Sequence, residues 1–116
     1  MTPHKLLSHL GARLVTPAPK TTPPTLATLA RAEILAHFAY TAALEAYTDA
    51  LRRQLDGHRV EDAPRIHAAK LAAGRAWMEA MDALDAALVA AGRAPIGVAT
   101  PRGPALEALI QEEASP

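Results

Sequence analysis

The sequence contains no cysteine, and this absence removes three classes of chemistry at once. A protein without thiols has no disulfide framework, no thiolate zinc site and no cysteine nucleophile. An excess of charge is also missing, because twelve basic residues stand against twelve acidic ones. The chain therefore lacks the positive field that attracts phosphate backbones or anionic membranes, and nucleic acid is not an expected partner.

Long hydrophobic runs are absent as well. No segment approaches the roughly 20 consecutive apolar residues that a membrane-spanning helix requires, and residues 1–14 lack the apolar centre of a signal peptide. The sequence thus predicts a cytoplasmic protein without a membrane partner. A virus particle assembled in the cytoplasm is compatible with the same features.

Aromatic residues are few, with one Trp, two Tyr and one Phe, whereas roughly a quarter of the chain is Ala. Half of the residues are apolar, but most of these side chains are small, and each contributes little on burial. Such a core needs very close helix packing or additional burial against another chain. Composition therefore points to an oligomer or to a protein partner.

Two long stretches, the second interrupted only by Gly74, predict two long helices. Thr22 or Thr25 can cap the first helix, which meets no Gly or Pro before Gly57. A polar connection, DGHRVEDAP, then leads into a second helix from about Ala63 to Ala91, which ends at Gly92 and Pro95. The predicted core, residues 25–92, is an antiparallel helical hairpin.

Helical periodicity assigns one buried face to each of these helices. The predicted face of the first helix comprises Leu26, Leu29, Glu33, His37, Tyr40, Leu44, Tyr47, Leu51 and Leu55. The predicted face of the second comprises Ile66, Ala69, Ala73, Ala76, Trp77, Ala80, Met81, Leu84, Ala87, Leu88 and Ala91. Alanine at so many positions of the second face favours a close approach of the two backbones.

Short helices are expected at both termini. Thr2 and Pro3 open the first, and the Pro-rich arm that follows it completes the unit 1–24. A second Pro/Gly-rich arm and a helix opened by Gly103-Pro104 make up the unit 93–116. The fold class is therefore all-α, and these terminal helices complete a four-helix bundle either in cis or by oligomerisation.

Apolar residues outside the hairpin seam indicate surfaces for protein contact. The predicted interaction residues are Leu6, Leu7, Leu10, Ile34, Leu35, Phe38, Leu71, Met78, Val89, Leu106, Leu109 and Ile110. A second chain, the terminal helices or another protein would cover them. Self-association or a protein partner follows as the expected mode of action.

The most suggestive polar pair is Glu33 and His37, which stand four residues apart within the predicted buried face. This spacing allows a carboxylate and an imidazole to share a metal ion or a proton. A dinuclear carboxylate site needs about four to six ligands, and the acidic residues of the second helix lie mostly away from its seam. The pair therefore predicts a polar network in the core, to which Tyr40 and Tyr47 can contribute, and no cofactor, metal or catalytic residue is assigned.

The sequence therefore predicts a non-enzymatic structural or interaction protein that acts through helical contacts and terminal arms. A minor component of a large assembly, such as a phage particle, is one setting for such a chain. Two alternatives stay open. One is a small helical-bundle metal-binding or hydrolytic enzyme that uses Glu33 and His37, and the other is an adaptor or inhibitor that binds one protein target.

Overall fold

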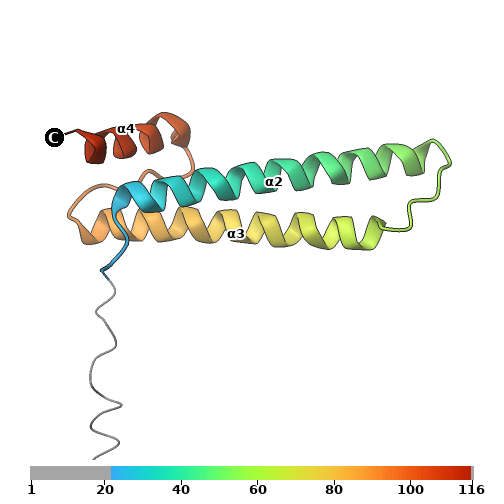
Figure 1. Cartoon of the computed structure of the whole chain (residues 1–116), viewed down its shortest axis with the longest axis horizontal. Helices are drawn as coiled ribbons and strands as arrows, with labels where there is room; N and C mark the ends of the chain where they lie inside the picture. Colours follow the sequence, from blue (N-terminus) through green and yellow to red (C-terminus); the bar gives the residue numbers. More distant parts are fainter. Residues whose placement is uncertain (1–21, 116) are drawn as a thin grey trace, which may run out of the picture.

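The computed structural model describes residues 22–115, and in this part of the chain all regular structure is helical (Figure 1). The helices are α2 (Leu26–Leu55), α3 (Ala63–Ala90) and α4 (Arg102–Ala114). Helices α2 and α3 form the long antiparallel hairpin, which confirms the predicted fold class. The predicted N-terminal helix with Leu6, Leu7 and Leu10 lies outside the described residues.

Local hydrogen bonds explain where the hairpin helices begin and end. The hydroxyl of Thr25 accepts a hydrogen bond from the Thr28 amide at 3.1 Å and so caps α2, as predicted. Both long helices end in a Schellman motif with a glycine at positive φ, Gly57 at 86° and Gly92 at 76°. The amide two positions beyond each helical C-cap returns to the third-last helical carbonyl, at 2.9 Å for His58 and 2.8 Å for Arg93.

The seam between α2 and α3 follows a repeat of three and four residues. Its members are Leu29, Glu33, Ala36, Tyr40, Ala43, Tyr47 and Ala50 on α2, and Ile66, Lys70, Ala73, Trp77, Ala80, Leu84 and Ala87 on α3, all buried or half-buried. This spacing averages 3.5 residues and keeps the seam facing the partner helix along its length. Large and small side chains mostly alternate, so each large residue has room beside an alanine.

Three leucines predicted to lie in the seam are exposed instead. The exposed fractions are 38% for Leu44, 42% for Leu51 and 88% for Leu55. The prediction used the 3.6-residue period of a straight helix, whereas the seam follows a 3.5-residue repeat, so the two diverge along a helix of this length. Ala43 and Ala50 occupy the seam, and the leucine that follows each of them falls on its flank.

The second helix differs from its predicted face in the same way. Ala69, Ala76 and Ala91 are exposed, whereas Ala73, Ala80 and Ala87 take the seam positions. At these three positions α3 offers only backbone and Cβ atoms for contact with α2.

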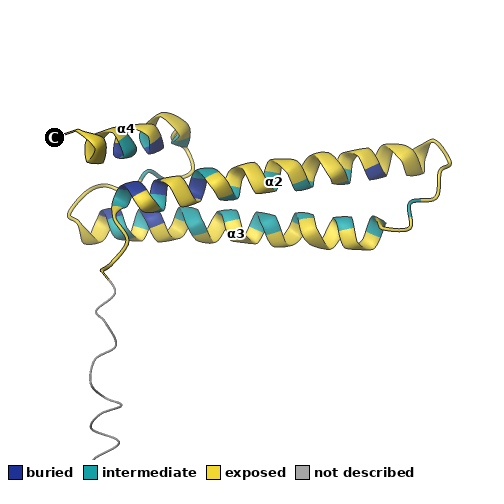
Figure 2. Ribbon diagram, viewed as in Figure 1, coloured by how far each residue is buried: buried dark blue, intermediate teal, exposed yellow. Residues whose placement is uncertain are grey.

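The core lies at the open end of the hairpin, which is the end opposite the α2–α3 turn (Figure 2). There α4 folds back and packs against α2 in the same chain. The buried cluster consists of Ala30, Leu84, Leu88, Leu106 and Leu109, with Leu26, Leu29, Ile34, Ile96 and Ile110 packed against it. The turn end of the hairpin is only two helices thick, and there Ala50 is buried.

Mid-helix Gly74 makes room for an aromatic ring. A Cβ atom at this position would lie 3.3 Å from Cε1 of Tyr40, whose ring stacks on Trp77 at a centroid distance of 5.4 Å. The absence of a side chain at Gly74 therefore lets the ring of Tyr40 approach α3 closely.

Among the described residues, no helix combines the length and the apolar character needed to cross a membrane. The exposed pair of Asp49 and Arg53, four residues apart on α2, forms at 3.2 Å. Pairs of this kind contribute only a few tenths of a kcal/mol, about 0.3 to 0.5, so the hairpin depends on packing.

Packing at the seam can be tested by enlarging one alanine. Ala50→Leu places extra methylene groups into a closed seam, and we expect a loss of about 1 to 3 kcal/mol in the free energy of unfolding. The matched control is Ala68→Leu at an exposed position of α3 outside the seam, where we expect little change. Guanidinium unfolding followed by circular dichroism measures both, and equal stability of the two variants would contradict the seam assignment.

Candidate functional site

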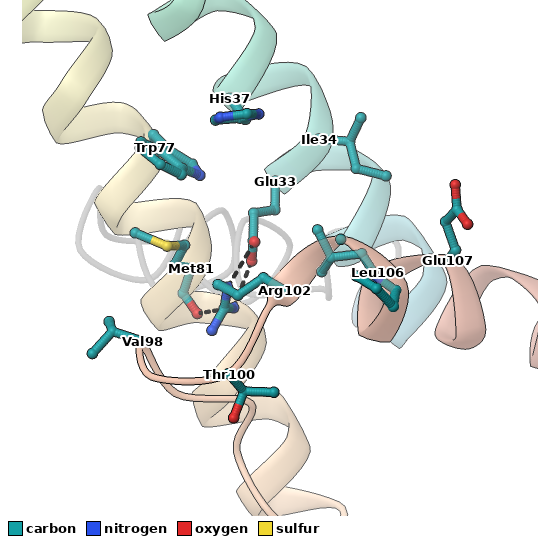
Figure 3. A pocket seen from close by; sticks show the side chains of 12 residues that line it. Glu33, Ile34, His37, Trp77, Met81, Val98, Thr100, Arg102, Leu106 and Glu107 are labelled. Carbon is teal, nitrogen blue, oxygen red and sulfur yellow. Dashed lines mark hydrogen bonds and ion pairs between the residues drawn. The ribbon is translucent and has the colours of Figure 1, made fainter.

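Arg102, the first residue of α4, is the centre of a buried ion-pair cluster that joins all three described helices (Figure 3). Its Nε and Nη2 atoms donate to the two carboxylate oxygens of Glu33 on α2, at 2.8 and 2.6 Å. Nη1 and Nη2 each donate at 3.2 Å to the oxygens of Asp85 on α3. Nη1 also donates to the Gly97 carbonyl at 3.2 Å, so acceptors are present for all five guanidinium N–H groups.

Asp85 ties the loop before α4 to the hairpin. In addition to Arg102, its carboxylate accepts hydrogen bonds from the amides of Ile96 and Gly97, both at 3.2 Å. The two loop amides and the guanidinium of Arg102 thus stabilise the negative charges of Asp85 and Glu33. The loop between α3 and α4 is thereby held in the position that sends α4 back along α2.

Burial and hydrogen bonding act against each other at Asp85. Burial acts to raise the pKa of Asp85, but the hydrogen bonds from Arg102 and the two loop amides outweigh it, and the pKa lies below its ordinary value. The pKa of Arg102 is raised, first by its hydrogen bonds with Glu33 and in spite of burial. Glu33 is only 1% exposed and has no other cation in contact within residues 22–115.

The predicted network of Glu33 with His37 and the tyrosines is not formed. Both oxygens of Glu33 are directed to Arg102, while the ring of His37 packs on Trp77 at 4.6 Å between centroids. Tyr47 lies farther along the seam, where its ring meets His67 at 5.2 Å and the ammonium of Lys70 at 4.1 Å. The polar patch in the core is thus an ion-pair cluster with a distant arginine.

Within the described part of the chain, no group of three or more His, Asp and Glu side chains is close enough to hold a metal ion. Glu33 and His37 therefore have no third ligand of these types there. A metal ion bound to Glu33 would have to displace Arg102, because this guanidinium already engages both oxygens of Glu33.

A pocket of about 790 Å³ opens beside the ion-pair cluster. Figure 3 shows Trp77 and His37 on one side of the Glu33–Arg102 pair and Val98 and Thr100 on the other. Its lining residues come from both hairpin helices, the loop and α4, and they are Glu33, Ile34, His37, Trp77, Met81, Val98, Thr100, Arg102, Gly103, Pro104, Leu106 and Glu107. Volume and mostly apolar walls are typical of sites that bind a ligand or an apolar segment.

Leu6, Leu7 and Leu10 lie outside the described residues, and the structure separates the other predicted interaction residues into two groups. Leu106 and Leu109 are buried in the chain's own core, and Ile34 and Ile110 pack against them. Large exposed fractions remain at the others, with 68% for Leu35, 64% for Phe38, 48% for Leu71, 60% for Met78 and 57% for Val89. Only the second group is available for contact with another protein.

Sequence reasoning missed Arg102 as the partner of Glu33 and Asp85 as the second carboxylate that Arg102 binds. Arg102 follows Glu33 by 69 positions, and no local spacing connects two residues so far apart. One signal was available, because a carboxylate at a seam position of an apolar helix requires a buried cation or donor. An arginine at the start of a helix that returns to the same end of the hairpin supplies one.

Loss of the guanidinium should detach α4. Arg102→Met leaves two carboxylates in a largely buried site, and we expect a loss of about 3 kcal/mol or more. Arg102→Lys keeps the charge but cannot bind both carboxylates through a planar fork, so we expect it to restore only part of the stability. Hydrogen exchange of residues 102–114 is the measurement, and Arg93→Met, which breaks the exposed pair with Glu112, is the matched control.

Acid should weaken the same contact. Since the pKa of Asp85 is lower in the folded protein than in the unfolded chain, its contribution to stability is present above the ordinary pKa and is lost as pH falls below about 4. Asp85→Asn should be less stable at neutral pH and should lose less stability on acidification. Unfolding at a series of pH values tests this, and identical pH profiles for the two proteins would contradict it.

Comparison with protein families, with curated proteins and with solved structures finds no match to this chain.

Proposed function

We propose that the protein is a non-enzymatic interaction protein that binds another helical surface through its hairpin, and that a second copy of the same hairpin is its first partner. The observation that carries this proposal is a stripe of exposed alanines, extended by Leu35, along one flank of the described two-helix hairpin. Most of the large exposed apolar side chains, among them Leu44, Leu71 and Met78, follow seam residues and therefore lie on the other flank.

The geometry of the hairpin favours one flank for this contact. Ala32, Ala39 and Ala46 each precede a large seam residue of α2, and Ala69, Ala76 and Ala83 stand in the same relation to the seam of α3. In an antiparallel pair, residues that precede the seam on both helices lie on the same side. All six alanines are exposed, and Leu35 extends their stripe on α2.

An alanine flank of this kind permits close helix packing. Small side chains allow two backbones to approach near the lower end of the usual range of about 8 to 10 Å. A second hairpin on this flank would convert a two-helix section into a four-helix one and would bury Leu35. Such packing would supply the burial that an alanine-rich core lacks.

Of the two alternatives, an adaptor or inhibitor would use the same exposed surface and would differ only in the protein that it binds. The enzyme alternative requires Glu33 to leave Arg102 for a metal or a substrate. A phage particle as the assembly stays a prediction. The same holds for a role of the N-terminal arm between subunits.

Self-association can be tested with two matched pairs of substitutions on one helix. Ala39→Arg with Ala46→Arg places charge on the alanine flank, whereas Thr41→Arg with Thr48→Arg places the same charge at the same spacing on the opposite flank. We expect the native protein and the threonine variant to be dimers or larger, and the alanine variant to be monomeric. Light scattering during size-exclusion chromatography gives the masses.

A native protein that is monomeric over the accessible concentration range would refute self-association. Metal analysis of the same chromatographic peak addresses the enzyme alternative. A stoichiometric metal that is lost in Glu33→Ala with His37→Ala would favour that alternative over ours.

A further inference from the structure

The pocket at the open end of the hairpin is open to solvent on one side among the described residues. Trp77 and Met81 are half-buried there, and Val98 on the opposite side is 89% exposed. The walls are mostly apolar, and the nearest charges, Glu33 and Arg102, already satisfy each other. An occupant of this pocket would therefore bind chiefly through apolar side chains.

The described part of the chain begins close to this pocket. Residues 1–21 connect to α2 at its N-terminal end, and Glu33 on the pocket wall lies roughly 10 Å along that helix from Leu26. The Pro-rich segment 16–24, in an extended polyproline conformation, spans up to about 28 Å. The residues before it thus have enough connecting chain to reach the pocket within the same molecule.

The chemistry of that segment complements the pocket. Residues 3–10 include Leu6, Leu7 and Leu10 at helical spacing, which present an apolar face. Residues 1–21 also contain three basic side chains and no acidic one, so all twelve acidic residues of the chain lie beyond them. At the rim of the pocket stands Glu107, which is exposed and forms no ion pair within residues 22–115.

We propose that residues 3–10 of the same chain occupy the pocket as a further helix of the fold, with their leucines against Trp77, Met81 and Val98. Lys5 or Arg13 then lies near Glu107. Attachment to α2 favours this occupant over a separate molecule, because a short connection gives an effective concentration in the millimolar range. The proposal is independent of the self-association of the hairpin, which uses the opposite flank.

Trp77 is the only tryptophan of the protein, and it reports on the pocket directly. In the full-length chain, Leu6→Ser with Leu7→Ser and Leu10→Ser should shift its emission to longer wavelength and increase its quenching by acrylamide. The control is Leu55→Ser at an exposed position of the turn end, which should leave the emission unchanged. Far-UV circular dichroism verifies that the hairpin remains helical, and an unchanged Trp77 signal in the triple variant would overturn the proposal.

The absence of native cysteine permits a second measurement that identifies the occupant. Leu10→Cys with Val98→Cys should form a disulfide within one chain on mild oxidation, whereas Leu10→Cys with Leu55→Cys should not. A disulfide that instead links two chains would overturn the assignment to the same molecule. The alanine-flank variant, Ala39→Arg with Ala46→Arg, is the background for both measurements, so that failure of self-association and failure of this proposal give different results.

Discussion

The contact between Arg102 and Glu33 is the constraint on which the rest of the described structure depends. Glu33 stands in the hairpin seam, where a lone carboxylate would be unfavourable, and Arg102 satisfies it only if α4 begins at this point of the hairpin. The return of α4 in turn closes the buried leucine cluster. A single guanidinium thus connects the packing of the hairpin, the path of the loop and the position of the last helix.

Alanine determines how the hairpin itself is built. In the seam it lets aromatic and charged residues alternate with small ones, and the 3.5-residue repeat keeps them in register. On the exposed flank, alanine instead leaves a flat surface that buries little apolar area within the chain. Within residues 22–115, α2, α3 and α4 pack together at the open end, and α2 and α3 alone form the turn end (Figure 2).

The two flanks of the hairpin are chemically different. On one flank α4, the loop and the ion-pair cluster form a pocket with a polar floor and apolar walls. The other flank carries a stripe of alanines with one exposed leucine and no described helix over it. This asymmetry is the physical basis for the two proposals, an intramolecular contact on the first flank and an intermolecular contact on the second.

The sequence by itself determined the helices, because caps, glycines and prolines act over a few residues. Thr25, Gly57 and Gly92 have the roles expected of them. Periodicity alone placed Leu44 and Leu51 incorrectly, since a wheel of 3.6 residues does not follow a seam of 3.5. Only the tertiary structure decided that Glu33 pairs with Arg102, which also pairs with Asp85, instead of with His37. The partner of a buried charge depends on which distant segments meet in space.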